Sequence, residues 1–267
     1  MAEKKAALFF DIDGTVISIS DHEVPKSAEK ALAMAQKNGH KIFINTGRAL
    51  CELPDNIRNL AFDGYLCACG SYLIYHDQVL LSEVLPKDRG YYYLDEMKRC
   101  NIECLLQGIE DMYFSEKPCR FEWLKKERRK VSPMGLGMKT PIEKRDYTYQ
   151  KMMICTDAKS DKERFFQVIS DYLIPIDMGN GVYECIQKNY SKATAIEYMQ
   201  NYLGIDKDQI YVFGDSGNDL TMFKYADHAI AMKDHDPVLD PYAEYVTDTV
   251  ENDGLYKALV HYGFIDI

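Results

Sequence analysis

Three turns of this sequence place oxygen-bearing side chains beside glycine, directly after an apolar run. The first turn carries Asp11 and Asp13, and a late one carries Asp215. A single Asp-x-Asp-Gly segment is often no more than a turn, but three such turns after apolar runs are hard to attribute to chance. Carboxylates buried together repel one another unless a cation joins them. An all-oxygen site that keeps waters and binds a substrate phosphate suits Mg²⁺.

The other polar groups in this set are suited to anions. Thr46 offers a hydroxyl and Gly47 a backbone N–H that a ligand can approach closely, and both can hold phosphate oxygens. Lys192 stands at the start of a predicted helix, where its charge and the free backbone N–H groups favour an anion. A lone Lys there is usually a solvated surface residue, so its importance depends on the other motifs.

Alternating strands and helices must position these residues. Apolar runs at 6–11, 41–45 and 209–214 predict buried strands, and helices are expected after Pro25 and over 192–203. This alternation of strands and helices is typical of an α/β fold with a mostly parallel sheet covered on both faces. Ligands of such sheets bind beyond the carboxyl ends of the strands, which is where the three polar turns fall.

The pattern changes in the middle of the chain. Residues 83–186 hold most of the basic residues, and the stretch 132–146 has two Pro, two Gly and no clear period. We therefore predict a core formed by residues 1–82 plus 187–267 and an inserted α/β domain at 83–186. The irregular stretch suggests a mobile or functional loop.

Composition limits the partners. The 32 Lys and Arg against 42 Asp and Glu give a formal charge of −10, which disfavours nucleic acid and anionic membranes. The first residues do not resemble a signal peptide, and no apolar run approaches the roughly 18 residues that span a bilayer. The eight scattered cysteines are expected to be reduced thiols rather than disulfides or a zinc site. A cytoplasmic location is expected by elimination.

The ordered motifs resemble the haloacid-dehalogenase-like superfamily. The superfamily's four motifs occur here in order as Asp11-x-Asp13-Gly14-Thr15, Thr46-Gly47-Arg48, Lys192, and Gly214-Asp215-x-x-Asn218-Asp219. The insert between the second and third motifs and the Ser191-Lys192 context look like the Cof-type subfamily. That resemblance implies a Rossmann-like doubly wound parallel sheet with an inserted α/β cap of type IIB.

The resemblance also implies roles for the residues. Asp11 would be the nucleophile that forms an aspartyl-phosphate, and Asp13 would protonate the leaving oxygen and then activate water. Mg²⁺ would be held by Asp11, the backbone carbonyl of Asp13, and Asp215. The groups expected to hold the transferring phosphoryl are Thr46, Gly47, Lys192 and Asn218. Asp219 would orient Lys192 or a metal-bound water.

The implied activity is hydrolysis of a small phosphorylated metabolite, such as a sugar phosphate. A phosphomutase, which returns the phosphoryl group to its substrate, is an alternative within the superfamily. A signalling protein that accepts phosphate without turnover is an alternative of another class. Asp13 argues against it, because such a protein has no leaving alcohol to protonate.

Two segments depart from the family pattern and leave the substrate open. Cys69-Gly70-Ser71 stands where Asn-Gly-Ala is usual, and Lys233-Asp234-His235 where Gly-Asn-Ala is usual. Substrate discrimination is expected from the insert, because the core motifs read only phosphate. The candidates there are Arg120, Trp123 and Glu184, although helix salt bridges and ordinary core packing would explain them too.

Overall fold

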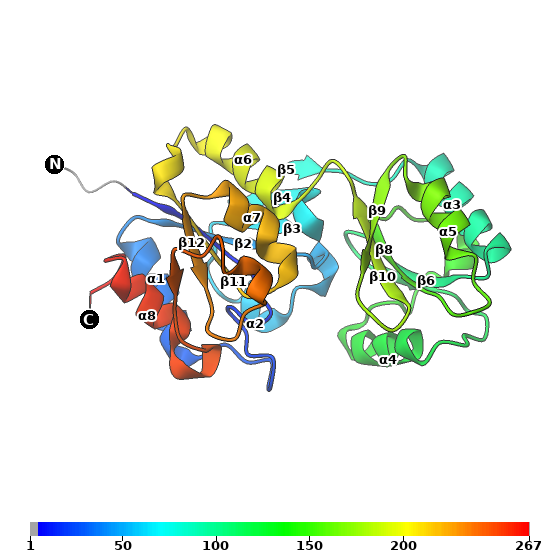
Figure 1. The fold of residues 1–267 in the computed structure, drawn as a ribbon, viewed down its shortest axis with the longest axis horizontal. Coiled ribbons are helices and arrows are strands. Elements are labelled where there is room, and N and C mark those ends of the chain that lie inside the picture. The colour runs from blue at the N-terminus through cyan, green and yellow to red at the C-terminus, as the bar shows by residue number, and fades with distance from the viewer. Residues whose placement is uncertain (1–4, 267) are drawn as a thin grey trace. The chain divides into compact units, whose positions relative to one another are not determined.

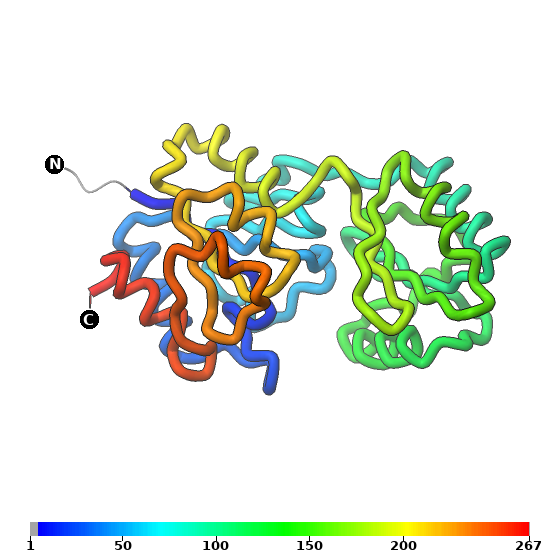
Figure 2. Tube along the Cα trace, viewed as in Figure 1, coloured from blue at the N-terminus to red at the C-terminus, as the bar shows by residue number. Residues whose placement is uncertain are grey.

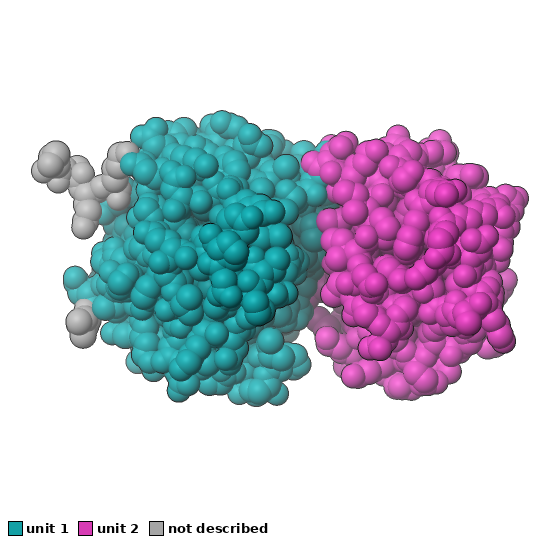
Figure 3. Space-filling model, viewed as in Figure 1, with its two compact units in different colours: residues 1–48, 53–81, 190–267 teal, residues 49–52, 82–189 magenta. Residues whose placement is uncertain are grey.

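The computed structural model describes residues 5–266, which form two compact units. The first contains the described residues up to 48, residues 53–81 and those from 190 onward, and the second contains 49–52 and 82–189 (Figure 3). Figure 2 follows the chain out of the first unit near residue 81 and back near residue 190. The short segment 49–52, which lies within the predicted core of 1–82, belongs to the second unit.

The first unit is built on an eight-stranded sheet in the order β13-β12-β11-β1-β2-β3-β4-β5. Its strands are β1 (Ala7–Phe10), β2 (Lys41–Asn45), β3 (Gly64–Cys67), β4 (Tyr72–Tyr75), β5 (Gln78–Ser82), β11 (Ile210–Gly214), β12 (His228–Ala231) and β13 (Tyr245–Val246). Pairing is parallel from β13 through β3 and becomes antiparallel between β3 and β4. The predicted α/β class with a mostly parallel sheet is confirmed.

The centre of this sheet is apolar on both faces. All four residues of β1 are buried, as a strand covered by helices on both sides requires. Phe9 stacks on Phe43 of β2 with ring centroids 4.9 Å apart, and Phe10 stacks on Phe213 of β11 at 4.5 Å. β1 therefore lies between β2 and β11, where the strand order reverses and ligands of open α/β sheets bind.

Helices cover both faces of the sheet (Figure 1). They are α1 (Lys26–Lys37), α2 (Asp55–Arg58), α6 (Lys192–Leu203), α7 (Leu220–Tyr225) and α8 (Gly254–His261). Helices α1 and α8 pack together, and α6 packs on α7. Ala28, Ala31, Leu32 and Ala35 form the buried stripe of α1 at the spacing of an amphipathic helix.

The second unit is an antiparallel sheet with helices on its faces. Its strand order is β7-β6-β8-β10-β9. The elements are α3 (Lys87–Arg99), β6 (Glu103–Gln107), β7 (Met112–Phe114), α4 (Glu122–Val131), β8 (Lys151–Cys155), α5 (Lys162–Ile169), β9 (Leu173–Asp177) and β10 (Val182–Gln187). One apolar cluster joins the sheet to α3 and α5, and a separate one joins its other face to α4.

The irregular stretch 132–146 contains two single turns of 3₁₀ helix, Ser132–Met134 and Ile142–Lys144.

The segment 49–52 is bound to the second unit by side chains: Gln107 Nε2 donates to Glu52 Oε2 at 2.7 Å, and Cys51 Sγ lies 3.3 Å from the Gly108 carbonyl. Over the described part of the chain, none of the helices is long and apolar enough to cross a membrane.

Candidate active site

Three buried carboxylates meet beyond the carboxyl ends of β1 and β11. Asp11 follows β1 directly, and Asp215 and Asp219 follow β11. Oxygens of the three side chains lie within 4.8 Å of one another, and all three residues are buried. Neighbouring parallel strands bring their ends to one edge of the sheet, so residues about 200 positions apart in the sequence come together here.

Lys192 joins two of these carboxylates. Its Nζ donates to Asp11 Oδ1 at 2.7 Å and to Asp219 Oδ1 at 2.5 Å, and its side chain is 1% exposed. Lys192 is the first residue of α6, whose N-cap Ser191 forms a capping box with Thr194. The predicted anion-binding lysine is thus a buried cation that holds the carboxylate cluster together.

Burial dominates the electrostatics of the cluster. Loss of water raises the pKa of Asp11 to about 7 against the opposing pull of Lys192, and Asp219 adds to the rise. The pKa of Asp215 is raised to about 8 by burial and by the charges of Asp11 and Asp219. Burial alone would lower the pKa of Lys192, but the two carboxylates that it contacts outweigh this effect and raise it. The cluster therefore holds more negative charge than one lysine balances.

Backbone geometry fixes the orientation of Asp215. Thr15 Oγ1 donates to Asp215 Oδ1 at 3.0 Å. Gly14 has a φ of +80°, and a Cβ on it would lie 2.4 Å from Asp215 Oδ2. Glycine is therefore required at position 14 both by its left-handed backbone and by the close approach of the carboxylate.

Asp219 is anchored by the turn in which it lies. The backbone N–H groups of Asp215 and Ser216 both donate to Asp219 Oδ2 at 3.0 Å. A Cβ at Gly214 would lie 2.6 Å from the same oxygen, so glycine is needed there as well. One oxygen of Asp219 thus holds its own loop and the other holds Lys192.

The predicted phosphate-holding groups lie beside one another. Thr46 follows β2 and is buried, and its Oγ1 accepts from the backbone N–H of Arg48 at 3.1 Å. A Cβ added to Gly47 would lie 3.5 Å from Cys69 Sγ and 3.8 Å from Asn218 Nδ2. The exposed Asn218 amide therefore lies next to the open backbone of Gly47.

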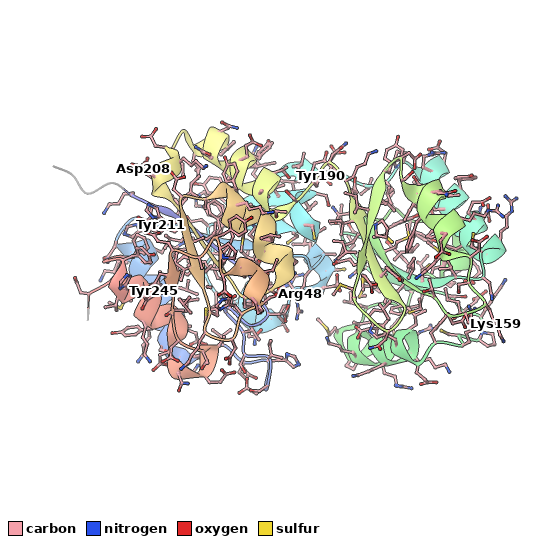
Figure 4. The ribbon with its side chains drawn as sticks, viewed as in Figure 1. Arg48, Lys159, Tyr190, Asp208, Tyr211 and Tyr245 are labelled. Atoms are coloured by element: carbon pink, nitrogen blue, oxygen red, sulfur yellow. The ribbon has the colours of Figure 1, made fainter. Side chains whose placement is uncertain are left out.

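Asp13 is not a member of the three-carboxylate cluster and contacts Arg48 instead. Its two oxygens lie 2.6 Å from Nη2 and 2.8 Å from Nε of Arg48, and both side chains are partly exposed. Arg48, labelled in Figure 4, follows the Thr46-Gly47 turn after β2. The sequence left the role of Arg48 open, and the structure places it on Asp13.

Two further site features escaped sequence reasoning. Asn45, the last residue of β2, is fully buried, and its Nδ2 donates to the Lys192 backbone carbonyl at 3.0 Å. The only indication in the sequence was that Asn45, a polar residue, ends an apolar strand. Gly70 has a φ of +89°, and a Cβ there would lie 2.3 Å from the Ser191 carbonyl. The Cys69–Ser71 departure thus packs against the start of α6.

The second departure from the family pattern lies near Asp215. The N–H of Asp236 donates to the Asp215 carbonyl at 2.7 Å. His235 is fixed by the Met232 carbonyl, 2.6 Å from its Nδ1, and by Asp240, 3.0 Å from its Nε2. This loop therefore supports the backbone that carries Asp215.

The three candidates in the insert have different surroundings. Arg120 is engaged within its own unit, because its Nη1 lies 3.0 Å from Glu103 and its Nε 3.1 Å from Asp157. Glu184 forms an ion pair with the buried Lys151. Trp123 packs, partly buried, against the α4 cluster.

The donor set fits a hard divalent cation. Asp11 and Asp215 offer carboxylate oxygens in a buried position, where burial and the neighbouring carboxylates raise both pKa values. Oxygen ligands of this kind are those that Mg²⁺ prefers. Asp219 completes the acidic group, but its Oδ1 already accepts from Lys192 and its Oδ2 accepts from two backbone N–H groups.

Known proteins resemble this chain over nearly its whole length. The curated relative YcsE of Bacillus subtilis, a 5-amino-6-(5-phospho-D-ribitylamino)uracil phosphatase, is 24% identical over 260 residues, covering 94% of this chain and 93% of its own. The solved structure of BT1666 from Bacteroides thetaiotaomicron is 25% identical, with a TM-score of 0.83 over 98% of this chain and 96% of that one. The subclass IIB sugar phosphatase BT4131 is also 25% identical, with a TM-score of 0.80 over 98% and 100%.

The relatives at this level of similarity place the chain among hydrolases. Residues 8–259 match the haloacid dehalogenase-like hydrolases, and the chain belongs to this family. The resemblance to the Cof-type branch drawn from the motifs is thereby confirmed.

Proposed function

We propose that the protein is a Mg²⁺-dependent phosphatase that hydrolyses a small phosphorylated metabolite, such as a sugar phosphate, through an aspartyl-phosphate on Asp11. The observation that carries this proposal is the contact of the buried Lys192 with Asp11 and Asp219 beside a third carboxylate, Asp215. Such a site combines a nucleophile with the positive charge that phosphoryl transfer needs. The named phosphatases among its relatives support the same reaction class.

The reaction takes two steps on the chain's own residues. A carboxylate oxygen of Asp11 attacks phosphorus, the bond between phosphorus and the substrate oxygen breaks, and Asp13 gives its proton to that oxygen. Asp13 then takes a proton from water, the resulting hydroxide attacks phosphorus, and the bond to Asp11 breaks to release phosphate. Arg48, which donates to both oxygens of Asp13 in the structure, orients this carboxyl group.

Other residues hold the phosphoryl group during both steps. Thr46 Oγ1, the Gly47 N–H, Lys192 and Asn218 supply hydrogen-bond donors on one side of the site. Asp11, Asp215 and the backbone carbonyl of Asp13 would hold Mg²⁺, which neutralises charge on the phosphoryl oxygens when bound. Asp219 keeps Lys192 in place.

The insert at 83–186 is assigned the role of a cap that selects the substrate, on a core of residues 1–82 plus 187–267. The phosphate-holding groups are the same for every phosphomonoester, so contacts to the leaving group must separate one substrate from another. We place the activity in the cytoplasm, where the eight cysteines, none of which forms a disulfide in the described structure, would stay reduced.

A panel of phosphorylated metabolites, assayed for phosphate release, tests the proposal. Asp11→Asn should abolish turnover, because an amide does not attack phosphorus, while Asp21→Asn on an exposed turn serves as the matched control. EDTA should remove activity, and Mg²⁺ should restore it better than Ca²⁺, whose looser coordination misplaces the in-line attack.

Two results would contradict the proposal. Phosphate release by folded Asp11→Asn protein at the wild-type rate would exclude Asp11 as nucleophile. Full activity in metal-free buffer would show that the carboxylate cluster works without a cation.

A further inference from the structure

The second unit contains a cavity that is independent of the carboxylate cluster. The cavity has a volume of about 370 Å³, and all of its lining residues lie between 94 and 143. This volume lies within the range of roughly 300–1,000 Å³ typical of small-molecule sites. The activity proposed above assigns no role to it.

The cavity arises where the edge strand of the sheet stops short. β7 pairs only Met112–Phe114 with Leu105–Gln107 of β6, so Glu103 and Cys104 have no β7 partner. After Phe114 the chain leaves the sheet and enters α4 at Glu122. The space left beside the start of β6 lies between α3, α4 and this connecting segment.

The floor of the cavity is apolar. Leu94 and Met97 reach it from α3, Phe114 from β7 and Leu124 from α4, and each is no more than 4% exposed. Burial raises the pKa of the Cys104 thiol at the floor, so that this group stays neutral. Transfer of an apolar ligand body from water to this apolar floor would therefore be favourable.

The rim carries more positive than negative charge. Its cations are Lys98, Lys117, Lys125 and Arg128, and its acids are Glu103 and Glu143. Both acids already have partners: Glu103 lies 3.0 Å from Arg120, and Glu143 accepts from Ser115 Oγ and from the Glu116 N–H at 3.2 Å. They are thus bound to the unit itself.

Two of the rim cations are available to a ligand. Lys98 and Lys125 have acidic neighbours on their own helices, Asp95 at 3.6 Å and Glu122 at 2.6 Å. Within residues 5–266, neither Lys117 nor Arg128 forms an ion pair with a carboxylate. Arg128 Nη1 donates to the Ser115 carbonyl at 3.1 Å, and the guanidinium lies over the Phe114 ring, 5.7 Å from its centroid.

We propose that this cavity of the second unit binds a small amphipathic anion, with an aryl or branched alkyl body on the Leu94–Met97–Phe114–Leu124 floor and a carboxylate or phosphate at Lys117 and Arg128. A planar guanidinium suits such groups because it donates two parallel hydrogen bonds. The ligand's charge and its apolar body are both needed for tight binding. None of the residues that line this cavity belongs to the carboxylate cluster or to the phosphate-holding groups.

Naphthalene-2-carboxylate is a suitable probe, and its uncharged amide is the matched control ligand. Binding to the full chain is followed in EDTA by the methyl resonances of Met97, which lines the cavity, and Met199, which is buried in the first unit. We expect the carboxylate to shift Met97 and not Met199, and to bind roughly tenfold more tightly than the amide, as one charge-assisted hydrogen bond implies.

Charge-removing variants complete the test. Lys117→Gln with Arg128→Gln should weaken binding of the carboxylate by roughly tenfold or more. Arg129→Gln with Lys130→Gln removes the same charge from exposed positions outside the lining and should leave binding unchanged. Equal thermal melting of the two double variants confirms that both fold. No shift of Met97, equal affinity for acid and amide, or equal loss in both double variants would overturn the proposal.

Discussion

Arg48 holds both carboxylate oxygens of Asp13, with Nη2 2.6 Å from Oδ1 and Nε 2.8 Å from Oδ2. This two-point contact fixes the plane of the carboxyl group, which a single hydrogen bond would not do. Asp13 is 45% exposed and Arg48 24% exposed, so water competes for the pair and its effect on stability is small. Its consequence is for catalysis, through the direction in which Asp13 presents a proton.

Arg48→Gln should therefore slow hydrolysis of alkyl phosphates by roughly 10–100-fold, the range expected for a misaligned general acid. Hydrolysis of p-nitrophenyl phosphate should fall much less, because its leaving group needs little protonation. Arg48→Lys should lie between, since an ammonium makes one contact where the guanidinium makes two. The measurement is kcat on both substrate types. Equal losses on the two types would mean that Arg48 acts on binding or folding and not on proton transfer.

Gly14 offers a separate test of how Asp215 is held. Gly14→Ala and Gly204→Ala both place alanine at a positive φ, +80° and +63°, and this backbone strain alone should lower the free energy of unfolding of each by about 1–2 kcal/mol. Only the Cβ at position 14 meets Asp215 Oδ2, because nothing lies within 4 Å of a Cβ at position 204.

Gly14→Ala should consequently weaken Mg²⁺ binding by roughly 10–100-fold, as displacement of a ligand-supporting group does, whereas Gly204→Ala should not. Calorimetric titration of both variants with Mg²⁺ measures the difference. If both variants bind Mg²⁺ like wild type, Asp215 is not a ligand whose orientation depends on Gly14.

The strand ends of the site were predictable and several contacts within it were not. Apolar runs before Asp11 and Asp215 mark buried parallel strands, and parallel topology brings their carboxyl ends together. The pairing of Arg48 with Asp13 depends on side-chain rotamers that no periodicity reports.

The attachment of Glu52 to Gln107, and hence of 49–52 to the second unit, joins residues 55 positions apart through side-chain hydrogen bonds. The cavity beside Cys104 exists because β7 leaves the first two residues of β6 unpaired. The ±1–2 residue position of a strand end is the least predictable feature of a sequence.

The raised pKa values of Asp11 and Asp215 predict how stability depends on pH. In the folded protein the pKa of Asp11 is about 7 and that of Asp215 about 8, against an ordinary value of 3.8. Both carboxyls therefore bind protons more tightly in the folded protein than in the unfolded chain. Their contribution to stability is therefore fully present below about pH 4 and is lost as the pH rises through 7–8. Mg²⁺ competes with these protons and should restore the loss at pH 8.

The measurement is the melting temperature of wild type and Asp215→Asn between pH 4.5 and 8.5. In EDTA, wild type should lose stability relative to Asp215→Asn as the pH rises, because the amide cannot become charged. Added Mg²⁺ should raise the melting temperature of wild type at pH 8 more than that of the variant. Parallel curves for the two proteins, with equal gains from Mg²⁺, would show that Asp215 carries no such charge.

The last prediction concerns two residues of the insert, Arg120 and Glu184, which have different surroundings in the structure. Arg120 bonds to Glu103 and Asp157 within the second unit, so Arg120→Ala should lower the melting temperature and leave the ranking of substrates in a phosphate-release panel unchanged. Glu184 differs, since it is paired with Lys151 on the face of the sheet opposite the α3 and α5 cluster.

A buried Lys–Glu pair is costly to desolvate and adds little stability, so its presence needs another explanation. We attribute it to recognition of the polar part of the substrate. Glu184→Gln should alter the ranking of sugar phosphates by about 10-fold, the value of one hydrogen bond to a charged group, while p-nitrophenyl phosphate should be hydrolysed at nearly the wild-type rate. A ranking that changes with Arg120→Ala and not with Glu184→Gln would reverse this assignment, and selectivity would then have to reside in the loop around Arg120.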